Sequence, residues 1–177
     1  MEKGRCHCGQ TEWEVKLDAK EHILWSEHAL FKGYRPELWL TSYSHCDTCK
    51  ILSGGTYTLN QIIPKEDLKV TKGNLKAYTY HGDSGKAVNC YYCPSTPHHL
   101  PNCSLGNSFP SSKDSLTTTD CTSHAYHHQE VMGDKVVVRT GLLESAAKMK
   151  PAAEIYGKAR YGWEKEVAQT FDTMPPS

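Results

Sequence analysis

The chain has 177 residues, enough for one domain with a single core, and its 20 basic residues balance its 20 acidic ones. This balance excludes the strongly basic surface that a nucleic acid or an anionic membrane would require. No apolar run reaches the length of a membrane span, and residues 1–5 lack the apolar segment of a secretory signal. We therefore expect a protein of the cytosol, with the nucleus as the alternative.

Most of the chain is predicted to form short β-strands separated by turns. Residues 11–17 alternate Trp13, Val15 and Leu17 with charged side chains, the pattern of a strand with one buried face. Further strands are predicted at residues 62–64, 68–71, 75–80 and 131–139, with turns at residues 72–74 and 133–134. One short helix is predicted over residues 142–150. The pattern predicts a mainly β fold with little helix, in one domain spanning residues 1–177.

Cysteine is the most informative residue type, because six of the eight cysteines stand in close pairs. In a reducing compartment such pairs hold a metal more often than they form disulfides, although buried free thiols are the alternative. Cys6 and Cys8 precede a strand, and Gly9 gives the turn its backbone freedom. Because structural zinc takes four ligands, two more must come from later in the chain. The candidates are Cys90, Cys93 and Cys121.

A second cluster lies at residues 44–49, which read Ser-His-Cys-Asp-Thr-Cys. Together with Gly4-Arg5-Cys6-His7-Cys8-Gly9 and Ser53-Gly54-Gly55, it resembles the glutathione-dependent formaldehyde-activating enzyme and centromere protein V family. Cys93-Pro94 and Cys121-Thr122-Ser123-His124 are similar to the third cysteine motif of that family, and Ala153-Glu154-Ile155 with Trp163 is similar to its closing segment.

The resemblance implies a zinc-stapled, Mss4-like β-sheet fold and two zinc sites. A structural zinc would be held by Cys6, Cys8, Cys93 and Cys121. A second, catalytic zinc would be held by Cys46 and Cys49, which are the implied catalytic residues. Ser44 stands where the family has a third cysteine, and a serine hydroxyl is a poor zinc ligand because it ionises with difficulty. His45 is a candidate replacement ligand.

The implied activity is that of a carbon–sulfur lyase, in which glutathione and formaldehyde give S-(hydroxymethyl)glutathione. The expected partner is therefore a small thiol, glutathione or its adduct. The alternative is a non-catalytic, zinc-stabilised binding module, or an accessory protein of a metabolic pathway, because a fold does not fix a function. The centromere-protein branch is associated with chromatin or microtubules, but the neutral charge of this chain argues against nucleic acid.

Residues 95–120 separate Cys93 from Cys121, although the family pattern places two residues between them. The segment is rich in Ser, Thr, Pro and Asn and lacks apolar periodicity, which predicts disorder. We favour the hypothesis that it is a translated, retained short intron. With suitable codons for Ser95 and Thr119-Asp120, excision would leave Cys93-Pro94-Asn-Cys121 in frame. A genuine loop insertion is the alternative, because the entropy of loop closure grows slowly with length. Cys103 lies within the segment and is expected to be uninvolved.

Several other residues invite a functional reading. Strand alternation would put His124 and His128 on one face and His127 on the other, most simply as surface or core residues. Tyr126 and Tyr156 are expected in the core. The turn after the second cluster, with Lys50, Ser53 and Gly54, could admit a thiol substrate, although a plain turn explains it equally well. Arg139 and Arg160 could bind the carboxylates of such a ligand, although surface salt bridges explain them equally well.

Overall fold

The structure is a computed structural model that describes residues 1–17, 41–95 and 121–175. The strands are β1 (Glu2–Arg5), β2 (Glu12–Val15), β3 (Thr41–Ser44), β4 (Thr58–Pro64), β5 (Leu68–Lys72), β6 (Lys76–His81), β7 (Ala87–Tyr92), β8 (His124–Gln129), β9 (Lys135–Arg139), β10 (Pro151–Ile155) and β11 (Gln169–Thr170). The α-helix of this part of the chain is α1 (Asp47–Ser53), and short 3-10 helices cover Lys65–Asp67, Glu130–Met132, Thr140–Leu142, Ala146–Lys148 and Gly157–Ala159. The prediction of a mainly β fold is confirmed. None of the described helices has the length and apolar character needed to cross a membrane.

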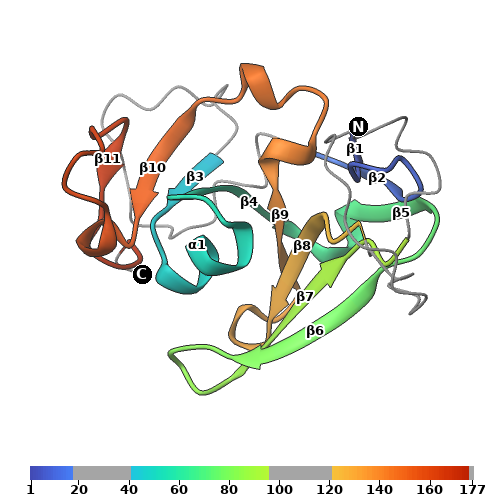
Figure 1. Ribbon diagram of the computed structural model, residues 1–177, viewed down its shortest axis with the longest axis horizontal. Coiled ribbons are helices and arrows are strands. Elements are labelled where there is room, and N and C mark those ends of the chain that lie inside the picture. Colours follow the sequence, from blue (N-terminus) through green and yellow to red (C-terminus); the bar gives the residue numbers. More distant parts are fainter. Residues whose placement is uncertain (18–40, 96–120, 176–177) are drawn as a thin grey trace, which may run out of the picture.

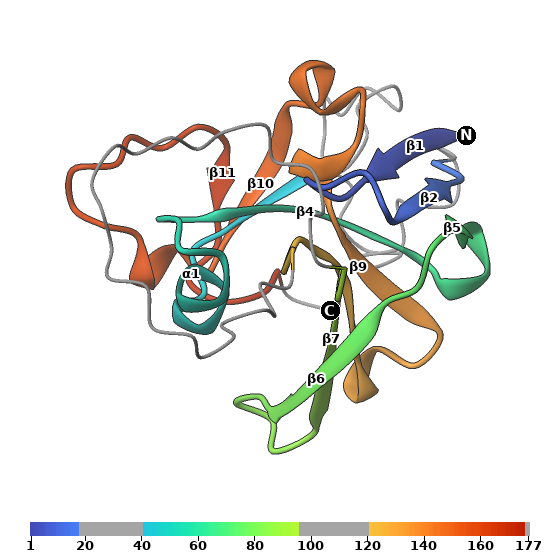
Figure 2. The same cartoon turned by 45° about the vertical axis from the view of Figure 1, so that its right-hand side comes forward.

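Two sheets make up the fold (Figure 1). The smaller has the strand order β1-β2-β5, and the larger has the order β11-β10-β3-β4-β9-β8-β7-β6. β10 runs parallel to both β3 and β11, whereas the other pairs are antiparallel. In both views the small sheet lies at one end of the molecule and β10 with β11 at the other (Figures 1 and 2). α1 lies below β4 in Figure 1, beside the centre of the large sheet.

Alternation along the central strands gives the large sheet two different faces. Ile63 pairs with Val136, and both are fully buried against Trp13 and Val15 of the small sheet. Ile62 pairs with Val137 on the opposite face. Because successive side chains point to opposite sides of a strand, one face of β4 and β9 builds the core and the other faces the region of α1.

The predicted strands at residues 11–17, 62–64, 68–71 and 75–80 are all present, and the turn at Gly73 has a φ of 68°. This turn joins two different sheets, since β5 pairs with β2 and β6 pairs with β7. Residues 142–150 do not form the predicted helix. They form parts of two 3-10 helices, and Leu143 and Met149 are buried in the core cluster. The helix α1 was not predicted, because seven residues are too few to display helical periodicity.

The predictions for residues 95–120, including Cys103, concern a segment of which the structure describes only Ser95. The disorder and retained-intron hypotheses therefore remain predictions.

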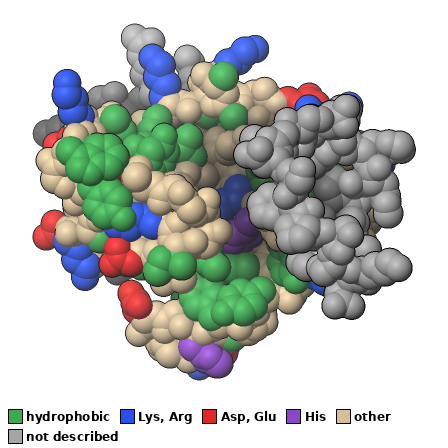
Figure 3. Space-filling view, viewed as in Figure 1, with side chains coloured by type: hydrophobic (Ala, Val, Ile, Leu, Met, Phe, Trp, Pro, Cys, Tyr) green, Lys and Arg blue, Asp and Glu red, His purple; other side chains and the backbone are tan. Residues whose placement is uncertain are grey.

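Exposed hydrophobic side chains gather over the segment between β10 and β11, at the left of Figure 3. Trp163 is 72% exposed and Tyr161 is 44% exposed, and their ring centroids lie 5.9 Å apart.

Candidate metal centre and thiol cavity

Four cysteines from distant parts of the chain converge between the two sheets. The ligand atoms of Cys6, Cys8, Cys93 and Cys121 all lie within 4.8 Å of one another. The Sγ atom of Cys8 is 3.4 Å from that of Cys6 and 3.8 Å from that of Cys93. In a tetrahedral zinc–thiolate site with Zn–S bonds of about 2.3 Å, adjacent sulfurs are separated by about 3.8 Å. The cluster could therefore hold a metal ion. Cys121, and not Cys90, completes the set of four.

Two tight turns hold these thiols in place. In the first, Gly9 adopts a φ of 72° and donates its N–H to the carbonyl of Cys6 at 3.1 Å. In the second, the N–H of Thr122 donates to the carbonyl of Cys93 at 3.0 Å, and that of Cys121 donates to Ser95 at 2.8 Å. Ser95 and Cys121, the described residues on either side of 96–120, therefore meet at the four-cysteine cluster.

Hydrogen bonds from neighbouring groups favour the thiolate form of several ligands. Thr11 donates its N–H to the sulfur of Cys6 and its hydroxyl to that of Cys93, each at 3.2 Å. Burial raises the pKa of Cys121, but hydrogen bonds from Ser123 and from the backbone of Cys8 outweigh it and lower that pKa to about 6. Such donors stabilise the negative charge that a metal-binding thiol must carry.

The second cysteine pair lies on the opposite face of the large sheet. Cys46 is the N-cap of α1 and Cys49 lies in its first turn, and both line a cavity of about 240 Å³. Other walls of the cavity are formed by Ser44, Asn60, Tyr80, His127, Val137 and Tyr156. The hydrogen bond from the Cys46 thiol, followed by the positive charge of Arg139, lowers the pKa of Cys49 to about 6. Donating that hydrogen bond raises the pKa of Cys46.

The residues before Cys46 do not complete a metal site there. Ser44 is buried and its hydroxyl accepts a hydrogen bond from the N–H of Cys46 at 3.4 Å. The His45 ring is fully buried, with Nε2 3.0 Å from Glu154 and Nδ1 3.3 Å from Glu164. The second distance is within ion-pair range but outside hydrogen-bond geometry. Both ring nitrogens of His45 therefore face glutamates, Glu154 and Glu164, contrary to the idea that His45 replaces a cysteine ligand. Among the residues described, the four-cysteine cluster is the only group of three or more His, Cys, Asp or Glu side chains with metal-binding geometry.

Arg139 supplies the positive charge that acts on the Cys46–Cys49 pair, and it is buried, not a surface residue. It is 7% exposed, donates to the side-chain oxygen of Asn60 at 2.7 Å, and lies 3.4 Å from Nδ1 of His124. Its positive charge helps to lower the pKa of the Cys49 thiol. Composition alone could not reveal this position, because the burial of Arg139 depends on its place at the end of the central strand β9.

The prediction that His124 and His127 lie on opposite faces of their strand is wrong. A register shift between Tyr91 and Tyr92, opposite β8, interrupts the alternation, and the two histidine rings lie 5.7 Å apart. A bulge of this kind places residues three apart on one side of the strand. His127 lines the cavity, and His128 instead contacts the carbonyl of Gly133 at 2.7 Å.

The remaining candidates have structural partners. Lys50 is buried, with Nζ 2.8 Å from Asp47 and from the carbonyl of Ala159, and 4.3 Å from the ring centroid of Tyr161. Arg160 pairs with the buried Glu154 at 3.1 Å. The Ser53 hydroxyl donates to the carbonyl of Lys50, and Gly54 ends α1 with a φ of 66°. Half-buried Tyr126 stacks on Tyr91, whereas half-buried Tyr156 lines the cavity.

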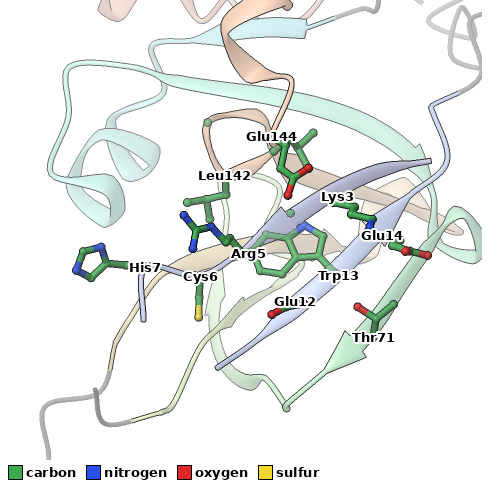
Figure 4. Close-up of a pocket in the computed structure, with 13 residues that line it drawn as sticks. Lys3, Arg5, Cys6, His7, Glu12, Trp13, Glu14, Thr71, Leu142 and Glu144 are labelled. Atoms are coloured by element: carbon green, nitrogen blue, oxygen red, sulfur yellow. The ribbon is translucent and has the colours of Figure 1, made fainter. Parts of the chain in front are cut away.

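A second hollow, an open groove of about 770 Å³, runs along β1 and β2 (Figure 4). Its walls include Lys3, Arg5, Glu12, Glu14 and Glu144, and the indole of Trp13 lies at its centre. Basic and acidic side chains alternate around this groove, so its charges favour no one class of ion.

These features define a β-rich protein with a four-cysteine cluster that could hold a metal ion and, separately, a two-thiol cavity. A family model described as "Glutathione-dependent formaldehyde-activating enzyme" matches residues 31–104, a stretch that includes Cys46, Cys49 and Cys93. The chain is also similar to a crystal structure of a Rhodobacter sphaeroides protein, with 19% identity and a TM-score of 0.45, over 80% of this chain and 87% of the other. No curated protein matches the sequence.

Proposed function

We propose that this protein acts on adducts of glutathione or a similar small thiol, as a carbon–sulfur lyase of the formaldehyde-activating type. The observation that carries this proposal is that Cys46 and Cys49 open into one cavity, within the stretch that matches the family model. In the synthetic direction the thiol sulfur adds to the carbonyl carbon of formaldehyde, and the thiol proton passes to the carbonyl oxygen. The lyase direction breaks the same carbon–sulfur bond.

In this proposal zinc binds to Cys6, Cys8, Cys93 and Cys121 and has a structural role. The four sulfurs meet the number and spacing that a tetrahedral zinc site needs, and hydrogen bonds to the sulfurs support their ionised form. Because the ligands come from segments far apart in the sequence, zinc binding would contribute directly to the free energy of folding.

A second, catalytic zinc at Cys46 and Cys49 remains a prediction with an incomplete set of ligands. Catalytic zinc takes three protein ligands, and the described residues supply two thiols and the neutral hydroxyl of Ser44. We therefore assign no step of the reaction to a second zinc.

His127 is the candidate in the cavity for transferring the proton of the thiol substrate. Burial, and then the charge of Arg139, lower the pKa of His127 well below its ordinary value, so the imidazole is neutral at neutral pH. Its Nδ1 is buried and has no hydrogen-bond partner among the described residues. A neutral imidazole that lines the same cavity as the thiol pair could take the thiol proton and pass it to the carbonyl oxygen.

The same cavity would also serve a non-catalytic, zinc-stabilised protein that binds a small thiol or has an accessory role in a metabolic pathway. The incomplete ligand set at Ser44 favours this second candidate. The two candidates agree on a structural zinc and on thiol binding, and they differ only in turnover.

The test combines zinc content, glutathione binding by calorimetry, and the rate of formaldehyde exchange with S-(hydroxymethyl)glutathione by NMR. The lyase proposal predicts an exchange rate above that of the uncatalysed reaction, which falls in Cys49→Ala and in His127→Gln, with glutathione binding retained in the latter. Ile51→Ala is the matched control, because Ile51 is 80% exposed on the same helix. Binding without accelerated exchange would leave the accessory protein, and the absence of both would exclude both candidates.

A further inference from the structure

The pair of thiols at Cys46 and Cys49 has the arrangement of a dithiol that can close into a disulfide. The two residues begin α1, where the N–H of Lys50 donates to the carbonyl of Cys46 at 3.0 Å. Both thiols line the 240 Å³ cavity. Residues three apart are neighbours on one turn of a helix, so an S–S bond between Cys46 and Cys49 requires only a small approach of the two side chains, and the cavity gives a reagent access to both thiols.

The surroundings of the pair disfavour a metal ion, in contrast to the four-cysteine cluster. The described residues add no third thiol, imidazole or carboxylate at metal-binding distance. The positive charge of Arg139 acts on Cys49, and a fixed cation near this thiol repels a Zn²⁺ ion. Asn60 and His124 hold the guanidinium of Arg139 in position. Two thiols near a fixed cation are therefore better suited to thiol exchange than to holding a metal ion.

We propose that Cys46 and Cys49 form a thiol–disulfide exchange pair whose co-reactant is a low-molecular-weight disulfide, of which glutathione disulfide is the representative. The thiolate of one cysteine attacks a sulfur of glutathione disulfide, so a mixed disulfide forms and one glutathione leaves as the thiol. The second cysteine then attacks the protein sulfur of the mixed disulfide, and the second glutathione leaves. The protein loses two electrons and two protons, and one glutathione disulfide becomes two glutathiones.

This inference shares the cavity with the proposed function but does not need the lyase reaction. Ser44 links this inference to the proposed lyase reaction. A cysteine at that position would offer a third thiolate beside Cys46 and Cys49, and it would favour zinc binding by these thiols over their oxidation. The variant Ser44→Cys therefore separates the two chemistries within the same fold.

The experiment exposes the zinc-loaded full chain to mixtures of glutathione and glutathione disulfide, followed by acid quenching, alkylation of free thiols and peptide mass mapping. We expect a loss of two hydrogen masses, assigned to a Cys46–Cys49 disulfide and reversed by excess glutathione, with zinc retained by the four-cysteine cluster. Cys46→Ser should instead accumulate glutathione on Cys49. Cys90→Ser is the matched control, because Cys90 is a buried thiol outside that pair, and it should leave the oxidised fraction unchanged.

Ser44→Cys should bind more zinc per chain and show a smaller oxidised fraction in the same buffers. A wild-type pair that stays reduced and holds a second zinc would overturn the proposal, as would oxidation of the four-cysteine cluster in its place. Exchange of formaldehyde is measured on the same samples. Disulfide formation without exchange activity removes the proposed function and keeps this inference, whereas exchange activity with a pair that resists oxidation does the reverse.

Discussion

The backbone N–H of Cys121 donates a hydrogen bond to the carbonyl of Ser95 at 2.8 Å, although residues 96–120 separate the two in the sequence. Cys93, two residues before Ser95, shares the metal cluster with Cys121. Ser95 and Cys121 therefore meet beside the four-cysteine cluster.

This closure predicts that the intervening segment is dispensable for metal binding. A variant in which a single Asn replaces residues 95–120 would contain Cys93-Pro94-Asn-Cys121, and we expect it to bind as much zinc as the full chain. Shortening a loop whose ends already meet should change the stability by no more than about 1–2 kcal/mol. Zinc content and thermal unfolding measure both quantities, and loss of the cluster's zinc would mean that the segment supports the site. Sequencing the transcript tests the intron hypothesis independently.

Removal of one ligand of the four-cysteine cluster should unfold much of the protein. For Cys93→Ser we expect loss of the bound zinc and a destabilisation of more than about 4 kcal/mol, because metal binding and folding are coupled. Cys90→Ser is the matched control, since Cys90 is also a buried thiol but lies outside the cluster. Zinc content and denaturant unfolding should separate the variants, and equal effects would contradict the assignment.

Gly4 is expected to tolerate no side chain. A Cβ atom at Gly4 would overlap the indole ring of Trp13, which is 1% exposed and cannot move aside. Gly4→Ala should therefore destabilise the protein by at least about 1–3 kcal/mol. Gly141→Ala is the control, because nothing lies within 4 Å of its Cβ position. The midpoint of urea unfolding measures the difference, and similar midpoints would show that the small sheet adjusts.

The buried carboxylate of Glu154 joins His45, which lies between β3 and α1, to residues 160–168. It accepts hydrogen bonds from His45 at 3.0 Å and Arg160 at 3.1 Å, and from the N–H groups of Val167 and Ala168. Removal of one partner of such a buried pair costs about 3–5 kcal/mol, which we expect for Glu154→Ala. Glu154→Gln keeps an acceptor oxygen and should lose less. Hydrogen exchange should locate the increased opening at β10 and β11, and uniform protection would contradict this role.

Acid should weaken the fold through His124. Burial, followed by the charge of Arg139, lowers the pKa of His124 from 6.5 to about 4. The unfolded chain therefore binds more protons than the folded one in this range, so stability is full above pH 6.5 and falls as the pH drops toward 4. The loss amounts to at most about 3 kcal/mol.

The check is the free energy of unfolding of the wild type and of His124→Gln between pH 7 and pH 4.5, with zinc content recorded at each point. The variant should show a shallower slope wherever the cluster keeps its zinc. Parallel slopes would assign the acid sensitivity to other groups.

How far the sequence could predict the fold depended on whether a segment was buried on one face. The alternation Trp13, Val15, Leu17 revealed a strand, because its other side chains are polar. β3 (Thr41–Ser44) and the seven-residue α1 escaped prediction, because buried polar residues and a helix of about two turns have no distinctive periodicity. The strand alternation of the histidines failed at a bulge, which depends on how β8 pairs with β7.

By itself the sequence determined the mainly β character of the protein and the residues able to bind metal, because both follow from local patterns of hydrophobicity and cysteine spacing. The tertiary structure decided which thiols meet. It brought Cys121 to Cys93, and it left Cys46 and Cys49 as a pair on the opposite face of the sheet. It also buried Arg139 beside Cys49. These relationships arise from strand pairing between distant segments, and the spacing of residues along the chain carries no information about that pairing.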